Sequence, residues 1–377
     1  MDGRSAEWAE RFFIAFLLMI VDTIVMNSAI DRPTDVRPGE SLDVERLGPV
    51  LRDALKVDGD VEVLQFPSGF SNLTYLLKVG GIEVVLRRPP FGSKPKSGHD
   101  MKREHDVLAA LHGTFRYCPK PLMYCDDETI IGSPFYVMER IQGIIVRRDF
   151  PSGLSLSPDD IGLLFDRLVD VHVELHSVDF KAVGLEGFGK PEGYIERQVK
   201  GWSDRYRRAR TPDVPDCESV MGWLEANRPA DTGNGCIIHN DFRLDNVVLD
   251  HGDPLRIIGI LDWEMATLGD PLMDLGASLA YWVEKKDPPA FQALGMMPTN
   301  SDGAPTRAEV VARYGAKSGL DVADFSFYYC YGLFRLAVIV QQIYFRSYHG
   351  QTEDPRFRSL NLWVGALADA AEKVAVR

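Results

Sequence analysis

The sequence lacks the signals of several protein classes. Its five cysteines are scattered and form no Cys-x-x-Cys pair, so neither a zinc site nor a disulfide framework is predicted. The net charge is -13 and there is no long basic stripe, which argues against a nucleic-acid partner. Neither an internal repeat nor a low-complexity tract is present. Scattered free thiols suit a reducing compartment, and we therefore expect a cytoplasmic protein.

The sequence also lacks an apolar run long enough for a clear membrane span. The run at residues 12–21 has ten residues and ends at Asp22, whereas a span needs roughly 20. Three interpretations stay open, in this order of preference. Translation starts at Met26 and the upstream run is not native; the run is an amphipathic helix at a dimer interface or membrane surface; or it is an anchor. Residues 1–40 are interpreted as an extension and linker, and membrane contact is the less favoured interpretation.

The length and the hydrophobic pattern predict an α+β protein with two lobes that join near residue 142. Residues 41–142 are predicted to form a mostly β lobe, in which Gly80-Gly81 turns a hairpin. Its expected elements are helices at 42–55 and 97–111 and strands at 61–66, 73–79, 83–87 and 134–143. Residues 143–377 are predicted to form a mainly helical lobe. Its expected helices are at 159–177, 194–210, 220–227, 274–283, 308–318, 325–348 and 360–375.

Some features of the two lobes have both a structural and a functional interpretation. The Gly/Ser turn at residues 67–75 can lay backbone N–H groups against phosphates, although taken alone an ordinary hairpin turn is favoured. Glu104 shares a helix face with apolar residues, so we expect it to pair with Arg87 or Arg88 rather than lie exposed.

The helical lobe holds two further candidate groups. His172 and His176 are expected to be core histidines, because no acidic partner lies at a metal-binding spacing. The arginines between residues 205 and 210 suit an anionic group on a substrate, but a solvated helix face is slightly favoured.

The strongest signal is a pair of apolar runs that each end in polar residues. The first leads into His239, Asp241 and Asn246, and the second ends at Asp262. A turn at residues 249–254 separates them, so we expect a hairpin that brings Asp262 beside the first cluster. Phosphoryl transfer needs a proton acceptor and Mg²⁺ ligands. Asp241 suits the acceptor, and the amide and carboxylate oxygens of Asn246 and Asp262 suit the metal.

The neighbours of these residues are given supporting roles. Arg243 is expected to steady Asp241 or the transferred phosphate, and Glu264 to bind the metal or lie just behind its ligands.

Residues 239–246 resemble the HxDxxxxN loop of the aminoglycoside phosphotransferase-like kinases, and residues 262–264 resemble their DxE metal segment. The resemblance covers the chain from about residue 42 onward. It implies a two-lobed protein-kinase-like fold with an antiparallel sheet in the N-terminal lobe, and it implies ATP and Mg²⁺ as cofactors. It also implies that His239 forms structural hydrogen bonds while Asp241 carries the chemistry.

The resemblance also implies nucleotide contacts. The implied set is Ser68, Gly69, Ser71 and Asn72 on the phosphates, Arg87 with Glu104, and the connector residues Glu139 and Ile141 on the base. Arg87 departs from the family, which usually has lysine there; arginine keeps the charge but is bulkier and prefers bidentate contacts. Within the family, residues 84–90 and 335–350 resemble kinase domains associated with acyl-CoA dehydrogenases. Some of those are understood to phosphorylate hydroxyacyl-CoA or hydroxy acids.

Three functions are carried forward from the sequence. The first is a kinase for a hydroxyl of a small molecule, with an acyl-CoA among the candidate acceptors and a functional link to an acyl-CoA dehydrogenase. The second is a non-catalytic nucleotide-binding protein, which Arg87 favours. The third is an aminoglycoside-type antibiotic kinase, against which the arginine cluster argues mildly. A homodimer stays open.

Overall fold

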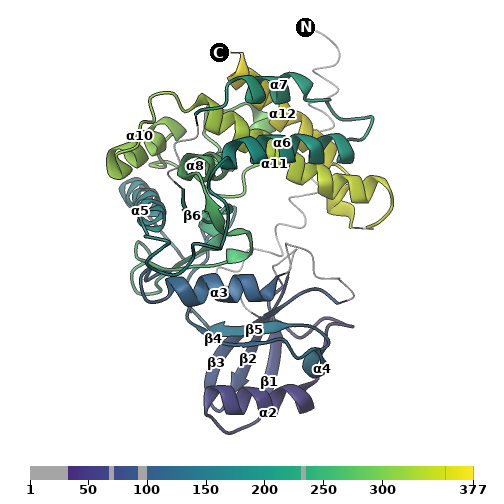
Figure 1. Ribbon diagram of the computed structural model, residues 1–377. Coiled ribbons are helices and arrows are strands. Elements are labelled where there is room, and N and C mark those ends of the chain that lie inside the picture. The colour runs from purple at the N-terminus through teal and green to yellow at the C-terminus, as the bar shows by residue number, and fades with distance from the viewer. Residues whose placement is uncertain (1–32, 68–71, 92–99, 231–234, 353, 377) are drawn as a thin grey trace.

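The computed structural model describes residues 33–67, 72–91, 100–230, 235–352 and 354–376 (Figure 1). The apolar run at residues 12–21 and residues 68–71 of the predicted phosphate turn lie outside these ranges. Within them, no helix combines the length and apolar character needed to cross a membrane.

The N-terminal lobe is built on a five-stranded antiparallel sheet of order β1-β2-β3-β5-β4 (Figure 1). The mostly β character of this lobe agrees with the sequence pattern, and the antiparallel sheet agrees with the family resemblance. Gly80 and Gly81 have φ values of +56° and +84° and turn β2 into β3, because glycine adopts these angles without strain. Strand β4 and the short helix α4 were not predicted. The strands are β1 (Val61–Gln65), β2 (Leu73–Val79), β3 (Ile82–Arg88), β4 (Pro121–Cys125) and β5 (Phe135–Glu139), and α4 spans Glu128–Ile131.

Two helices cover the two faces of this sheet. Helix α2 (Val44–Leu55) packs on one face, and α3 (Met101–Leu111) packs on the other, between the sheet and the helical lobe (Figure 1). Successive side chains of a strand point to opposite faces. Leu86 therefore packs with α2, whereas Arg87 faces α3. Asp100 caps α3, so the predicted start at residue 97 was too early.

The C-terminal lobe is mainly helical, as expected. Its longest helix, α11, packs against α6, α8 and α12 and forms the centre of the lobe. Helix α8 was predicted from Asp274 to residue 283, but it begins at Pro271 after the cap Asp270 and ends at Leu279. The helices are α5 (Pro158–His176), α6 (Tyr194–Ala209), α7 (Glu218–Ala226), α8 (Pro271–Leu279), α9 (Pro289–Gln292), α10 (Arg307–Ser318), α11 (Ser326–Tyr348) and α12 (Leu360–Ala375).

Two small antiparallel sheets position the polar clusters between the lobes. Strand β6 (Cys236–Ile238) pairs with β9 (Thr267–Gly269), and β7 (Val247–Leu249) pairs with β8 (Ile257–Ile260). The β7–β8 pair is the predicted hairpin.

The chain that crosses from β5 is fixed to β7. Ile144 and Leu249 exchange two backbone hydrogen bonds of 2.8 Å. A Cβ atom at Gly143 would lie 2.2 Å from the Leu249 carbonyl oxygen, so only glycine fits at this approach.

Candidate active site

His239 links the two polar segments. Its ring Nε2 lies 3.0 Å from the carbonyl oxygen of Leu261, which can only accept, so Nε2 carries the proton. Its Nδ1 then accepts the backbone N–H of Asp241 at 3.3 Å. Burial lowers the pKa of His239, in keeping with a neutral ring. Because both nitrogens are engaged, His239 positions the loop and has no free atom to act as a base.

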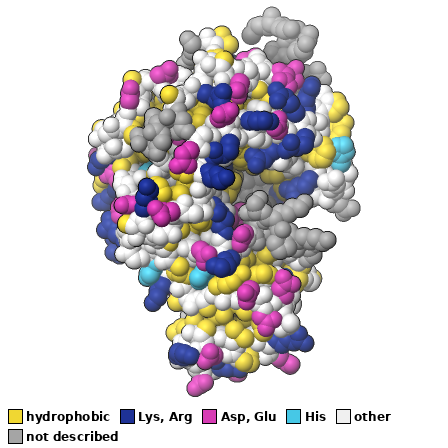
Figure 2. Space-filling view, in the orientation of Figure 1, with side chains coloured by type: hydrophobic (Ala, Val, Ile, Leu, Met, Phe, Trp, Pro, Cys, Tyr) yellow, Lys and Arg dark blue, Asp and Glu magenta, His cyan; other side chains and the backbone are white. Residues whose placement is uncertain are grey.

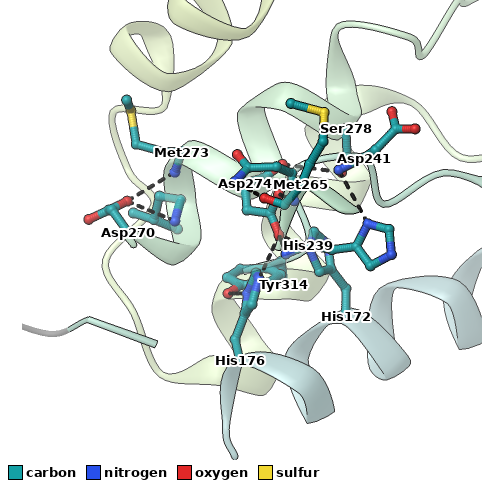
Figure 3. Close-up of polar contacts among 12 residues, drawn as sticks. His172, His176, His239, Asp241, Met265, Asp270, Met273, Asp274, Ser278 and Tyr314 are labelled. Carbon is teal, nitrogen blue, oxygen red and sulfur yellow. Dashed lines mark hydrogen bonds and ion pairs between the residues drawn. The ribbon is translucent and has the colours of Figure 1, made fainter. Parts of the chain in front are cut away.

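Asp274 anchors the same loop through its carboxylate (Figure 3). Its carboxylate accepts the backbone N–H groups of His239 at 2.8 Å and Asn240 at 2.7 Å. The Nε2 atoms of His172 and His176 each donate to it at 3.1 Å. Burial acts to raise the pKa of Asp274, but the two histidine hydrogen bonds outweigh it and hold the pKa well below its usual range.

These contacts make the two histidines buried donors, and their carboxylate partner lies about 100 residues away in sequence. The three side chains are close enough to share a cation. Each histidine already donates a hydrogen bond to the carboxylate, so an ion is not required.

Asp241 is oriented by the loop that carries it. The Nδ2 of Asn246 donates to both the carboxylate and the backbone carbonyl of Asp241, each at 2.9 Å. The Nε of Arg243 lies 2.9 Å from the Asp241 carboxylate, and its Nη2 lies 3.2 Å from Asp245. Burial would lower the pKa of Arg243, but the two carboxylates raise it. Figure 3 shows the Asp241 carboxylate pointing away from the Asp274 cluster. It is therefore placed to meet a group outside the loop.

Arg87 joins the lobes through carboxylates on both sides. Its guanidinium lies 3.4 Å from Glu104 in the N-terminal lobe, 2.9 Å from Asp262 and 3.2 Å from Glu264. Burial raises the pKa of Glu104 to about 7, although Arg87 opposes this. Burial also acts to raise the pKa of Asp262, but Arg87 outweighs it and lowers that pKa. The expected pairing of Glu104 with Arg87 is confirmed, and it extends to the opposite lobe.

The donor set fits a magnesium ion. Three carboxylates surround one guanidinium, so the local charge is negative when all are ionised. Since the amide nitrogen of Asn246 is committed to Asp241, its amide oxygen is the end left for a metal. Together with Asp262 and Glu264 it supplies hard oxygen donors, which Mg²⁺ prefers. Asp262 adopts φ +66°, a conformation uncommon for residues other than glycine and typical of functional sites.

The proposed phosphate-binding residues are only partly described. Ser68, Gly69 and Ser71 lie outside the described residues. Asn72 is buried, and its Nδ2 donates to Glu264 at 2.7 Å. The end of the predicted phosphate turn therefore touches the predicted metal segment.

The connector residues differ in what they offer to a base. The amide and the carboxylate of Glu139 are both bonded to the backbone of Lys120, at 2.9 and 2.8 Å. The amide of Ile141 has no hydrogen-bond partner among the described residues. Its side chain packs closely on Gly259, where a Cβ would approach it to 2.7 Å. Ile141 is therefore the better placed donor.

Sequence reasoning missed one residue that supports the site. Arg335 is buried in α11, and its Nη2 donates to the carbonyl of Asn240 at 2.8 Å. Its guanidinium also lies over the ring of Trp202, 5.3 Å from the centroid. A lone arginine in a long apolar helix was the available signal, because a buried charge needs such partners.

The sheet lobe with its buried glutamate, set against a helical lobe with this polar loop, defines a kinase-like phosphotransferase fold. Residues 62–310 match the family model described as "Phosphotransferase enzyme family" (APH), and the chain belongs to that family.

Two curated relatives resemble the chain over most of its length. It is 34% identical over 321 residues to mouse (Mus musculus) acyl-CoA dehydrogenase family member 10, which covers 85% of this chain and 30% of the relative. It is 35% identical over 320 residues to human (Homo sapiens) acyl-CoA dehydrogenase family member 11, covering 83% and 40%. The chain thus spans well under half the length of these relatives.

A solved structure gives the same fold. It is a crystal structure from Ralstonia eutropha, assigned provisionally as an aminoglycoside phosphotransferase. The TM-score is 0.76 at 30% identity, over 89% of this chain and 99% of the other. The expected α+β, two-lobed kinase-like fold is confirmed, whereas the lobe boundary at residue 142 stays a prediction.

Proposed function

We propose that the chain is an ATP- and Mg²⁺-dependent kinase that transfers the γ-phosphate to a hydroxyl of a small molecule. The observation that carries this proposal is the orientation of Asp241. Asn246 holds its carboxylate while Arg243 balances its charge, and the carboxylate points out of the loop (Figure 3).

In this proposal Asp241 takes the proton of the acceptor hydroxyl. The acceptor oxygen bonds to the γ-phosphorus as the bond from that phosphorus to the bridging oxygen of ADP breaks. Arg87, Asn72 and residues 68–71 hold the phosphates, and Asn246, Asp262 and Glu264 would hold the metal. A bound Mg²⁺ supplies neutralisation of the phosphate charge. The chain's own contribution is to align the hydroxyl and to receive its proton.

We propose a hydroxyacyl-CoA or a hydroxy acid as the acceptor. The names of the relatives support this choice, because both are acyl-CoA dehydrogenase family members. The same names support a functional link to an acyl-CoA dehydrogenase. Cytoplasmic location and a homodimer stay predictions.

The second candidate is a nucleotide-binding protein without turnover. Arg87 favours it, because it is bonded to the same carboxylates that a metal would use. An antibiotic kinase has the support of the Ralstonia structure's provisional assignment. Against it stands a groove lined with arginines in the helical lobe, which would repel a polycationic drug.

The test is ATP consumption by the purified chain with hydroxyacyl-CoAs, hydroxy acids, kanamycin and choline. We expect turnover with the first two classes, and a fall of about 10²- to 10⁴-fold in kcat for Asp241→Asn. Asp106→Asn is the matched control, because Asp106 is partly exposed on α3 and its ion-pair partners among the described residues are its neighbours Lys102 and His105. Binding of Mg·ATP with no turnover on any acceptor would favour the non-catalytic alternative.

A further inference from the structure

Helices α6 and α11 enclose an open groove that lies outside the catalytic loop. Its volume is about 500 Å³, and no residue assigned above to ATP, the metal or catalysis lines it. Arg205 and Arg208 enter it from α6, and Arg346 enters from α11. Ile339, Ile343 and Phe345 provide an apolar wall. Figure 2 shows Lys and Arg side chains gathered over these helices on the face in view.

Within the described part of the chain, the guanidinium groups of Arg205, Arg208 and Arg346 form no side-chain hydrogen bond and no ion pair within 4.0 Å. Arg205 lies over the ring of Trp202, 4.6 Å from its centroid, and the charge of Arg208 acts on Asp204 only from a longer distance. By contrast Arg207, on the same helix, is paired with Glu218 at 2.6 Å and does not line the groove. The repulsion among three guanidinium groups is relieved when an anion binds, and planar guanidinium groups suit phosphate. The sequence analysis slightly favoured a solvated helix face for the arginines between residues 205 and 210. In the structure, Arg205 and Arg208 line the groove, whereas Arg207 does not.

The groove is connected to the catalytic loop by α11. Arg335, four residues before Ile339 on this helix, donates to the backbone of Asn240, next to Asp241. At 1.5 Å per residue, the groove begins roughly 6 Å along the helix from Arg335 and reaches Arg346 after roughly 16 Å. A ligand bound in the groove therefore needs a long, extended part to reach the proposed reaction centre at Asp241.

We propose that this groove binds the phosphate-bearing end of the acceptor, a group of nucleotide size, while its hydroxyl end reaches Asp241. The inference rests on the proposed kinase function. A coenzyme A thioester has the required chemistry: phosphates for the arginines, a base for the apolar wall, and a peptide-like arm. That arm is comparable to four or five extended residues, roughly 15 Å. The groove thus selects acceptors that carry a phosphorylated handle over free hydroxy acids.

The test measures binding of coenzyme A to the full chain by calorimetry, without ATP. We expect binding that weakens at least tenfold in Arg205→Ala/Arg208→Ala and in Arg346→Ala. Arg207→Ala is the control for loss of charge, because it removes one positive charge from α6 outside the groove and should leave the affinity unchanged. Equal weakening in the control would reduce the effect to net charge and overturn the assignment. Binding to phosphatidylserine vesicles with none to coenzyme A would also overturn it.

A second measurement separates this inference from the kinase function. In the groove variants KM should rise for a hydroxyacyl-CoA, while kcat/KM for the matching free hydroxy acid stays constant. If coenzyme A binds in the groove but nothing is phosphorylated, the kinase proposal fails and the site stands. If a hydroxy acid is phosphorylated but coenzyme A does not bind, the groove assignment fails and the kinase stands.

Discussion

The Nη2 atom of Arg87 lies 2.9 Å from Oδ1 of Asp262, across the boundary between the sheet lobe and the helical lobe. The same guanidinium faces Glu104, which is itself buried. One cation thus balances carboxylates from both lobes. The stability of the fold and the geometry of the nucleotide site depend on the same side chain.

Replacing Arg87 by methionine should destabilise the protein strongly. Glu104 would be left buried without its counter-ion and Asp262, which is only partly buried, would lose its bond to the other lobe. Loss of one partner of a buried ion pair costs about 3–5 kcal/mol in the free energy of unfolding. Urea denaturation measures this loss. Adding Glu104→Gln to the same chain removes one of the stranded charges and should recover part of it. A loss below about 1 kcal/mol in the single variant would show that the pair does not stabilise the fold.

His172 should make the fold sensitive to mild acid. Burial lowers its pKa to about 4 from an ordinary value of 6.5, with the charge of His176 adding to the effect. His172 is therefore protonated near pH 6.5 in the unfolded chain but only near pH 4 in the folded chain. Its contribution to stability is present above pH 6.5 and is lost as the pH falls, by about 3 kcal/mol in all.

The matching variant is His172→Gln, which keeps an N–H donor for Asp274 and removes the titration. Between pH 6.5 and 4.5 the free energy of unfolding of this variant should fall less steeply with pH than that of the unmodified chain. The difference between the two slopes should correspond to the uptake of about one proton. Denaturant unfolding at several pH values gives the two slopes. Identical slopes would place the acid sensitivity elsewhere.

Loss of Arg335 should affect turnover more than nucleotide binding. Its hydrogen bond to the carbonyl of Asn240 holds a residue at φ +65°, immediately before Asp241. In Arg335→Met we expect kcat to fall by about 10- to 100-fold, because small displacements of reacting groups are costly. The KM for ATP should stay constant, since the proposed phosphate contacts lie mostly in the other lobe. Steady-state kinetics test this, and a raised KM with unchanged kcat would contradict it.

The close approach at Gly143 gives a prediction about packing. A methyl group there would lie 2.2 Å from the backbone oxygen of Leu249, so the connector must shift. We expect Gly143→Ala to lower the free energy of unfolding by about 1–3 kcal/mol. Gly222→Ala is the control, because Gly222 lies in α7 with nothing within 4 Å of the added Cβ. That change should instead stabilise by about 0.5–1 kcal/mol.

The sequence predicted what depends on local periodicity. Strand alternation placed β1, β2 and β3, and the helical face of Glu104 identified its pairing with an arginine of β3. Strand β4 was missed because its five residues are all partly exposed and show no alternation. The contact of His172 and His176 with Asp274 was missed because it joins segments about 100 residues apart. Spacing within one helix cannot reveal such a partner.

Sequence spacing also could not show which arginines of α6 line the groove. Their order in the sequence gives a basic helix end, but only the packing of α11 separates Arg207 from Arg205 and Arg208, which line the groove. Likewise, the Asp241 loop could be identified from spacing, whereas the support from Arg335 required the fold.

The fixing of the connector between β5 and β7 has a consequence for motion. Arg140 and Gln142 are both bonded to Glu83 of the sheet lobe, while Ile144 is bonded to Leu249 of the helical lobe. Only the few bonds around Gly143 separate these two attachments. At this crossing the lobes can hinge about a short pivot but cannot slide past one another, so opening of the cleft should be a rotation. The distance from the connector to Asp241 would then change little, while the outer edge of the sheet would travel furthest.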